Sequence, residues 1–342
     1  MSVNSSMIAI TLRKLAKNGV SWARLSLGDR SNISGATHAM YRLDARQSVE
    51  HIKKLYRSYM DNGKITEEEL QGKRFLEIGP GDCFGVALLF LAKGVDQVVA
   101  VDRFYTPKNS EQELKIYSVL RDELTDIEKR RFDDAVSFEE KPVFNANRLI
   151  YSYDIPIEHA AERLPIGSFD FIISMAVLEH VYDLSLAFES MDKLLNEKGR
   201  MLHGVDLSDH EIFSKFGYNP LTLLTVPDWL YHLMSSNTGD PNRDDVGCYR
   251  DKLKSLGYET RVLTAKVVGS NTEIVPHVES IKNSVHYADE QLAIVSSIRP
   301  KLLERYRNLS DEDLLQSAIF IDASKLSGSF RHKIVSGETA LY

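Results

Sequence analysis

The chain alternates between short apolar runs and polar turns, and the clearest example spans residues 75–102. An apolar run at 75–78 leads into the Gly-Pro-Gly turn 79–81, and the apolar residues 86–92 then have the density of a packed helix. A second apolar run follows at 98–101. Strand, tight turn, helix and strand in this order predict one parallel βαβ unit that holds a ligand at the ends of its strands.

The same alternation continues along the chain and predicts an α/β fold with a doubly wound, mostly parallel sheet. The first later helix should begin after the cap residue Asp183 and end at Gly199. The expected elements are strands at 149–153, 169–174, 200–207, 258–265 and 315–323, and helices at 184–199, 249–256 and 289–308.

The N-terminal residues show an amphipathic helical pattern, and a second helix is expected over 49–60. The first pattern predicts a face with Ile8, Leu12 and Leu15, and basic side chains, Arg13, Lys14 and Lys17, that point away from it. A basic amphipathic helix can make peripheral contact with an anionic membrane surface. The alternative, which we favour, is a helix packed on its own domain.

Composition narrows the class of protein. Of the 342 residues, 43% are apolar and 27% are charged, as in an ordinary globular protein. The net charge of −7 and the lack of a long basic stripe argue against a nucleic-acid partner. No apolar run approaches the ~20 residues of a membrane span, and no signal-peptide core is present. We therefore expect a cytoplasmic protein, or one at the inner face of the membrane.

The first unit also indicates which ligand it holds. Asp102 follows Gly79 by 23 residues, near the offset at which an acid accepts hydrogen bonds from ribose hydroxyls. The third glycine of a dinucleotide fingerprint is replaced by Phe84, which counts against an NAD-dependent enzyme. Glu77, two residues before the turn, would repel a pyrophosphate but would suit a cationic ligand.

The acid-x-Gly-x-Gly pattern resembles the first motif of the class I S-adenosylmethionine (SAM)-dependent methyltransferases. In that family the glycine turn lies against the amino-acid part of SAM, and the acid after the second strand holds the ribose. Where many members have a further glycine, this chain has Cys83. The resemblance implies that SAM is the cofactor and that its binding residues are Glu77, Gly79, Pro80, Gly81, Asp102, Asp154 and Ser174.

A second resemblance covers the middle of the chain. The apolar strand pattern at 164–174 and the Leu-Glu-His-Val loop at 178–181 are similar to the fourth strand and following loop of the same family. Together the two regions extend over about residues 70–210. The resemblance implies the Rossmann-like, seven-stranded fold of these enzymes, in which the last two strands form an antiparallel hairpin at one sheet edge.

This fold implies three parts of the chain. Residues 1–70 would form a helical extension or cap, and residues 71–207 the SAM-binding core. Residues 208–342 would supply a substrate-side insert and the last strands of the same sheet. Such enlargements at both ends are expected to enclose the substrate.

The residues that could act in catalysis gather at the end of the fifth expected strand. Transfer to a hydroxyl needs a base, and a histidine oriented by a carboxylate is suited to that role. His210 is our first candidate, with Asp209 or Asp206 as the orienting group, and His180 is the second. His203 is a further candidate. The alternatives are that His203 is a core histidine and that the acids cap the next helix.

Two further sites are weighed on residue type. Asn242 and Arg243 could hold an anionic acceptor, because a guanidinium binds carboxylates and phosphates bidentately; the alternative is a surface arginine paired with Asp244. A divalent metal on Asp206, Asp209 and His210 is a second, less favoured alternative. No metal is expected.

The loop at 203–210, with the long segment that follows it, resembles methyltransferases associated with bacterial envelope polysaccharides. The hypothesis is therefore O-methylation of a sugar hydroxyl on a bacterial glycan. One alternative is methylation of a small-molecule or natural-product acceptor by the same fold. Another is a SAM-binding module without catalysis.

Overall fold

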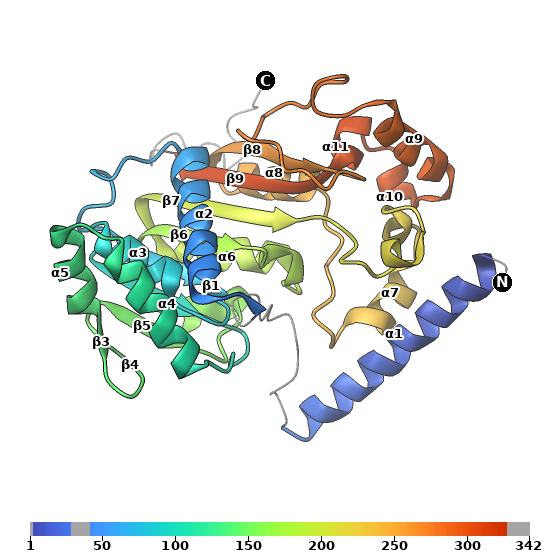
Figure 1. The fold of residues 1–342 in the computed structure, drawn as a ribbon. Coiled ribbons are helices and arrows are strands. Elements are labelled where there is room, and N and C mark those ends of the chain that lie inside the picture. Colours follow the sequence, from blue (N-terminus) through green and yellow to red (C-terminus); the bar gives the residue numbers. More distant parts are fainter. Residues whose placement is uncertain (1–2, 29–41, 327–342) are drawn as a thin grey trace.

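The computed structural model describes residues 3–28 and 42–326. Its centre is a seven-stranded sheet of order β5-β2-β1-β6-β7-β9-β8 (Figure 1). In that order the strands are Leu149–Ser152, Gln97–Val101, Arg74–Ile78, Phe169–Met175, Leu195–Asp206, Gln316–Lys325 and Tyr258–Val267. The first five run parallel, while β9 is antiparallel to both β7 and β8. The predicted sheet, with its antiparallel hairpin at one edge, is confirmed.

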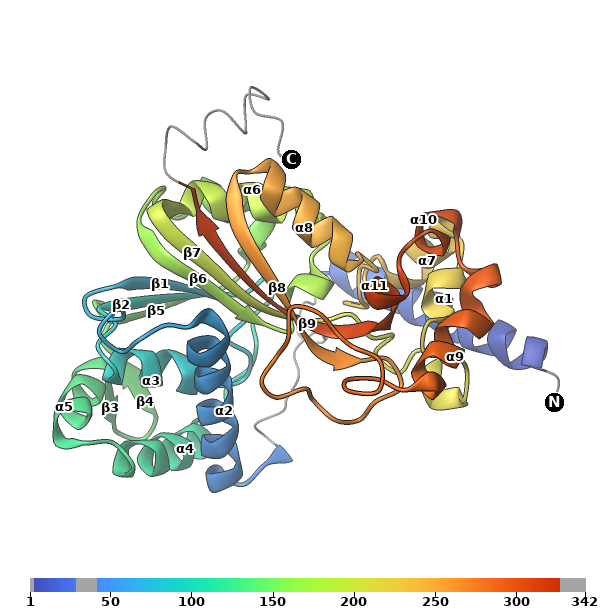
Figure 2. The same cartoon turned by 90° about the horizontal axis from the view of Figure 1, so that it is seen from above.

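Helices cover both faces of this sheet (Figure 2). Because side chains alternate along a strand, β1 sends Phe75 into the apolar cluster on one face and Leu76 into the cluster on the other. The first face carries α2 (Ala45–Gly63), α3 (Gly85–Ala92), α4 (Ser110–Asp122) and α5 (Asp126–Ala135), and the second carries α6 (Leu184–Leu194) and α8 (Val246–Ser255). The doubly wound arrangement is therefore also confirmed.

The remaining elements lie in the connections. A small antiparallel sheet of β3 (Val136–Phe138) and β4 (Pro142–Phe144) follows α5 and was not predicted. The others are α1 (Val3–Ser26), η2 (Ile157–Glu162), η3 (Leu178–His180), η4 (Ser214–Phe216), η5 (Thr222–Thr225), α7 (Asp228–Ser235), α9 (Asp289–Ile298), η6 (Arg299–Lys301), α10 (Glu304–Arg307) and α11 (Asp311–Leu315). In Figure 1 the arrow of β7 points toward the side where α7, α10 and α1 lie.

Two predicted boundaries are wrong. The helix expected over 289–308 ends at Ile298, because Pro300 lacks the amide N–H that a continuing helix would use. The helix expected to end at Gly199 ends at Leu194, and β7 already begins at Leu195. Leu195 is buried and pairs with Phe169 of β6, so sheet pairing takes these residues from the helix.

The face on which α1 packs also differs from the prediction. The helix lies against α7, and Leu15 of the predicted face packs there, half-buried. Ile10 supplies the fully buried apolar contact, however, while Ile8 and Leu12 are exposed. Lys14, expected to point away, forms an ion pair with Asp240 at 2.8 Å. Polar contacts with the rest of the protein, such as the ion pair of Lys14 with Asp240, therefore determine which face of α1 packs inward.

Among residues 3–28 and 42–326, no helix is both long and apolar enough to span a bilayer.

Candidate functional site

The glycine turn of the first motif forms at the carboxyl end of β1. Gly79 and Gly81 have φ of +69° and +71°, in the left-handed region that disfavours side chains. A Cβ atom on Gly79 would lie 2.6 Å from Cγ2 of Val177. The amide of Gly79 donates to the carbonyl of Val101 at 2.8 Å, which fixes the turn against β2. Position 79 therefore requires glycine for both its backbone angle and its neighbour.

A pocket lies at the carboxyl ends of β1, β2 and β6, where parallel sheets hold their ligands. We call it the donor pocket. Of the residues singled out from the sequence, it is lined by Gly79, Gly81, Asp102 and His180. Further lining residues that matter below are Arg103, Glu158, Val177 and Tyr182.

Asp102 was predicted from the sequence to bind the ribose, and its side chain lines the donor pocket. It follows β2, and its Oδ2 accepts a hydrogen bond from the hydroxyl of Tyr151 at 3.0 Å. Burial raises the pKa of this carboxyl to about 6. The second oxygen can accept hydrogen bonds from a vicinal diol, as the ribose of a nucleoside would supply.

Glu77 lies in β1, next to the pocket rather than in its lining. Its side chain is buried, and no described residue hydrogen-bonds to its Oε2. Burial raises its pKa to about 8, with Lys108 as the largest opposing influence. The carboxyl is therefore largely neutral at pH 7 until a cation approaches it.

Lys108 was missed by the sequence analysis. Its ammonium donates to the carbonyl of Gly81 and lies 4.3 Å from the ring centroid of Phe84. Burial lowers the pKa of Lys108, and Asp102 is the strongest influence that raises it again. A lone lysine in an extended loop carries no local signal, so only the folded chain reveals this contact.

A second missed group closes the far wall of the donor pocket. Arg103 forms an ion pair with the buried Glu158 and lies over the ring of Tyr182, 4.1 Å from its centroid. The same carboxylate accepts the amide of Tyr182 at 2.9 Å. Arg103 directly follows Asp102, and this neighbouring position is the one feature of the sequence that could have indicated its place in the pocket.

The other predicted SAM contacts lie outside the described lining of the pocket: Pro80, Asp154 and Ser174. Asp154 has a φ of +58°, and its neighbour Ile155 lines the pocket in its place. The hydroxyl of Ser174 instead pairs with Nδ1 of His203 at 2.7 Å.

The catalytic candidacy of His203 is therefore wrong. Its side chain is fully buried, and burial lowers its pKa to about 3. A neutral histidine bonded to a buried serine in the sheet is a core residue, because β7 directs this side chain toward the helix that carries Phe188.

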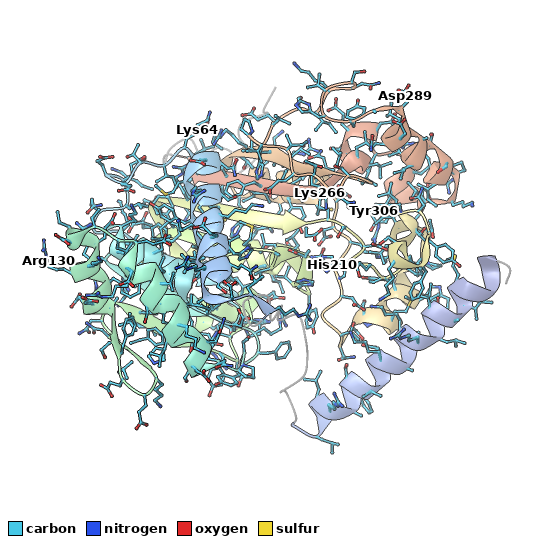
Figure 3. The ribbon with its side chains drawn as sticks, viewed as in Figure 1. Lys64, Arg130, His210, Lys266, Asp289 and Tyr306 are labelled. Atoms are coloured by element: carbon cyan, nitrogen blue, oxygen red, sulfur yellow. The ribbon has the colours of Figure 1, made fainter. Side chains whose placement is uncertain are left out.

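The two remaining histidines come together. The rings of His180 and His210 are 5.0 Å apart, centroid to centroid, in an edge-to-face arrangement. Figure 3 shows His210 beyond the end of the sheet, toward α7. Its φ of +47° is unusual for a residue with a side chain and marks a constrained loop. Burial lowers the pKa of His180 to about 4, so this ring is neutral at pH 7.

The structure separates the two acids proposed to orient His210. Oδ2 of Asp206 lies 3.6 Å from Nε2 of His210. Asp209 does not reach the ring. Its oxygens accept the amides of Glu211, Phe213 and Ser214 and the hydroxyl of Ser214. Asp209 thus holds the turn that leads into η4, although no helix begins at Glu211, where the alternative placed it.

The metal set considered from the sequence fails for the same reason, since Asp209 has no free oxygen to offer. The side chains that do approach one another are Glu179, His180 and His210, whose candidate ligand atoms lie within 4.8 Å. Glu179 belongs to the Leu-Glu-His-Val loop quoted from the sequence, but it was not among the predicted site residues. It is buried, and burial raises its pKa to about 8, so its carboxyl is largely neutral at pH 7.

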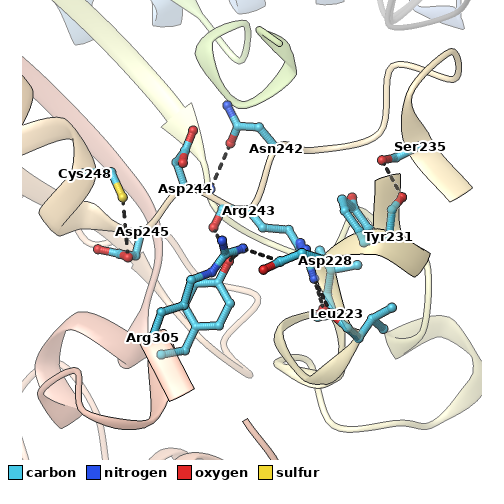
Figure 4. Close-up of polar contacts among 12 residues, drawn as sticks. Leu223, Asp228, Tyr231, Ser235, Asn242, Arg243, Asp244, Asp245, Cys248 and Arg305 are labelled. Atoms are coloured by element: carbon cyan, nitrogen blue, oxygen red, sulfur yellow. Dashed lines mark hydrogen bonds and ion pairs between the residues drawn. The ribbon is translucent and has the colours of Figure 1, made fainter. Parts of the chain in front are cut away.

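The acceptor role assigned to Arg243 is also wrong (Figure 4). Its side chain is only 3% exposed and stacks over the ring of Tyr231, 4.0 Å from the centroid. The guanidinium donates to the carbonyl of Val226 at 2.7 Å and to Asp228 at 2.6 Å. Asn242 is likewise structural, because its side chain donates to the carbonyl of Leu178 at 2.9 Å.

A second hollow lies on the other side of His210, between its loop and α1. We call it the basic cleft. It is lined by Ile10, Arg13, Lys14, Lys17, His210, Glu211, Ile212, Lys215 and Phe216. Lys14 is held by Asp240, whereas no described residue forms an ion pair with Arg13, Lys17 or Lys215. The cleft therefore has free positive charge next to a histidine.

Comparison with known proteins assigns the family. A sequence model described as a methyltransferase domain matches residues 50–237, more than half of the chain. The chain belongs to this methyltransferase family. Its first motif resembles that of the class I, SAM-dependent type, and SAM is the cofactor that this resemblance implies. No curated protein matches the chain.

Several solved structures are similar to the methyltransferase. YcgJ from Bacillus subtilis is 16% identical, with a TM-score of 0.39 over 80% of this chain and 99% of that chain. A SAM-dependent methyltransferase from Mesorhizobium loti is 16% identical, with a TM-score of 0.38 over 78% and 98%. Phosphoethanolamine N-methyltransferase 2 from Haemonchus contortus is 15% identical, with a TM-score of 0.40 over 80% and 52%. At TM-scores below 0.5, these likenesses add nothing to the family assignment.

The donor pocket of the methyltransferase fits this cofactor. The turn at Gly79 leaves no space for a Cβ, so the backbone itself can face a ligand. Asp102 offers an acceptor for ribose hydroxyls, and the buried Glu77 would favour a cationic group nearby. We expect these three residues to hold the amino-acid and ribose parts of SAM.

Asp102→Asn is expected to weaken the binding of S-adenosylhomocysteine (SAH) roughly 10- to 100-fold, the usual effect of losing hydrogen bonds to a charged group. Since the ionised carboxylate binds the ribose, SAH lowers the pKa of Asp102 below about 6. Wild-type affinity is thus complete above pH 6 for this group and falls as the pH drops through that value. Calorimetry across pH should show that the variant lacks this fall, and an unchanged SAH affinity would contradict the assignment.

Proposed function

We propose that this methyltransferase transfers a methyl group to a sugar hydroxyl of a bacterial glycan that carries negative charge. The observation that supports this most is the pair of His180 and His210. His180 lines the donor pocket, and His210 lines the basic cleft, with their rings 5.0 Å apart. A base thus lies between a site for the methyl donor and a site for an anionic molecule.

The pair suits transfer to a hydroxyl. When bound, SAM supplies a methyl group whose bond to sulfur breaks as the bond to the acceptor oxygen forms, leaving SAH. His210 accepts the proton that the hydroxyl loses, and Asp206 stabilises the imidazolium that results. His180, with a pKa lowered to about 4, stays neutral and adds no repulsion against a cationic donor.

The basic cleft supports an acidic acceptor. Arg243, expected to hold such a group, is committed to Asp228 and Val226, so we assign the role to Lys215, Arg13 and Lys17. Exposed Phe216 adds an apolar surface at the same cleft. The sugar itself is proposed on the resemblance of the loop at 203–210 to methyltransferases of envelope polysaccharides.

Lys215→Glu is expected to raise the KM for an acidic glycan roughly tenfold while leaving SAH affinity unchanged, because it reverses a charge in the cleft and not in the donor pocket. The assay supplies SAM with a labelled methyl group and compares acidic glycans with their reduced, neutral counterparts. The matched control is Lys254→Glu, an exposed lysine on α8.

Different results would point to the alternatives. A methyl ester or a methylated small molecule as product would replace the sugar hydroxyl as acceptor. Tight SAH binding without turnover on any fraction would indicate a binding module. Equal effects of the two lysine variants would remove the basic cleft as the acceptor site.

A further inference from the structure

The outward side of α1 carries a row of large apolar side chains that no described residue covers. Ile8, Leu12 and Trp22 are 61%, 60% and 62% exposed, and Val20 is also exposed. At 3.6 residues per turn, these four lie within an arc of about 160°. We call them the outer face of α1. An isolated apolar residue on a surface needs no explanation, but a continuous face on one helix does.

The inner side fixes this helix to the body of the protein. Ile10 packs into a cluster with Phe213 and Met234, and the side chain of Asn18 donates to the carbonyl of Leu233 at 2.9 Å. The amide of Asn237 donates back to Asn18 at 2.7 Å. The outer face is therefore held in a set orientation. Figures 1 and 2 agree that α1 lies along one end of the molecule.

The charged side chains of α1 itself are all basic. Residues 3–26 contain four basic and no acidic side chains, in a chain whose net charge is −7. Arg13, Lys17 and Arg24 occupy an arc of about 40° that borders the apolar row. None of them forms an ion pair with another residue in the described ranges. The helix thus combines an apolar strip, an exposed tryptophan and three cations that form no ion pair with a described residue.

We propose that the outer face of α1 binds to an anionic lipid bilayer, with the helix lying in the plane of the interface. Apolar side chains would enter the headgroup boundary, Trp22 would occupy the interfacial level, and the bordering cations would contact lipid phosphates. A second copy of the chain fits this face less well. A symmetric dimer would bring the same three cations of each copy together.

Binding in this orientation would bring the basic cleft close to the membrane, because Arg13 and Lys17 both line the cleft and border the outer face. The cleft would then open beside the lipid headgroups. The inference itself does not depend on the proposed acceptor, since it concerns binding to lipid and not turnover.

The test uses the full chain and vesicles of phosphatidylcholine, with or without phosphatidylglycerol. We expect co-sedimentation with the anionic vesicles, weakened by added salt, and little with the neutral ones. Leu12→Ser with Trp22→Ser should weaken binding roughly tenfold or more, since it removes two of the inserted side chains. Arg24→Glu, outside the cleft, should weaken binding to anionic vesicles by a similar factor.

The matched control is Ile127→Ser on α5, because Ile127 is 57% exposed and Figures 1 and 2 show α5 at the opposite end from α1. It should leave binding unchanged. A second readout needs no change in the outer face. The chain has two tryptophans, so Trp229→Phe leaves Trp22 as the single tryptophan, whose emission should shift to the blue on anionic vesicles.

Three results would overturn the proposal. The first is no binding to anionic vesicles together with no emission shift of Trp22. The second is an equal loss of binding in the Ile127 control. The third is a concentration-dependent dimer that the Leu12 and Trp22 changes abolish, without any affinity for vesicles, which would make the outer face a contact between two copies of the chain.

Discussion

Replacing His210 with alanine should lower turnover roughly 10²- to 10⁴-fold, the usual contribution of a positioned general base. The affinity for SAH should stay nearly unchanged, because His210 does not line the donor pocket. Steady-state kinetics with an accepted glycan, combined with calorimetry of SAH binding, would measure both quantities. The pH profile should change as well, since the variant lacks the group that accepts the proton.

His159→Ala is the matched control for this experiment. His159 has an exposed side chain next to Glu162 and should tolerate the change without loss of rate. Wild-type-like turnover in His210→Ala would exclude His210 as the base. If His180→Ala alone abolished turnover, the ring that lines the donor pocket would take over the role. A parallel loss of SAH binding would mean that the loop had collapsed.

Gly79→Ala should weaken SAH binding roughly 10- to 100-fold, because a Cβ at this position overpacks a pocket wall. The new methyl group would lie 2.6 Å from Cγ2 of Val177, which lines the donor pocket and would have to move into it. The left-handed backbone adds strain of about 1–2 kcal/mol to the folded state. Calorimetry of SAH binding and thermal unfolding would separate the two effects.

Gly72→Ala isolates the backbone contribution. Gly72 has the same φ of +69°, but a Cβ there would meet no atom within 4 Å. Gly72→Ala should therefore lose only the stability that backbone strain costs, and Gly79→Ala should lose more because of the added contact with Val177. SAH affinity should fall in Gly79→Ala alone. Equal affinities in the two variants would show that the contact with Val177 has no part in holding the cofactor.

Most of the sheet could be predicted because its strands are continuous apolar runs bounded by turns. The βαβ unit at 75–101 and the helix that begins after Asp183 appear where the pattern places them. Errors arose where one stretch satisfies two patterns. Leu195 fits the end of a helix as well as the start of a strand, and pairing with β6 decides for the strand.

The candidate site was predictable only in part. Gly79, Asp102 and His180 follow strand ends, and the carboxyl ends of parallel strands gather at one edge, so their approach to the donor pocket follows from sequence order. For polar residues within a strand or in a long connection, sequence order does not predict whether the side chain reaches the pocket. His203 faces the core, and Arg243 closes over Tyr231, although each has a type suited to catalysis or binding.

The amino-acid sequence by itself determined the sheet, the glycine turn and the acid at Asp102, because each depends on residues a few positions apart. Only the tertiary structure decided which charges surround the site and which face of α1 is exposed. Lys14 meets Asp240 across 226 positions of sequence, and Lys108 reaches Gly81 across 27. Such contacts are selected by packing among distant segments, which no local pattern encodes.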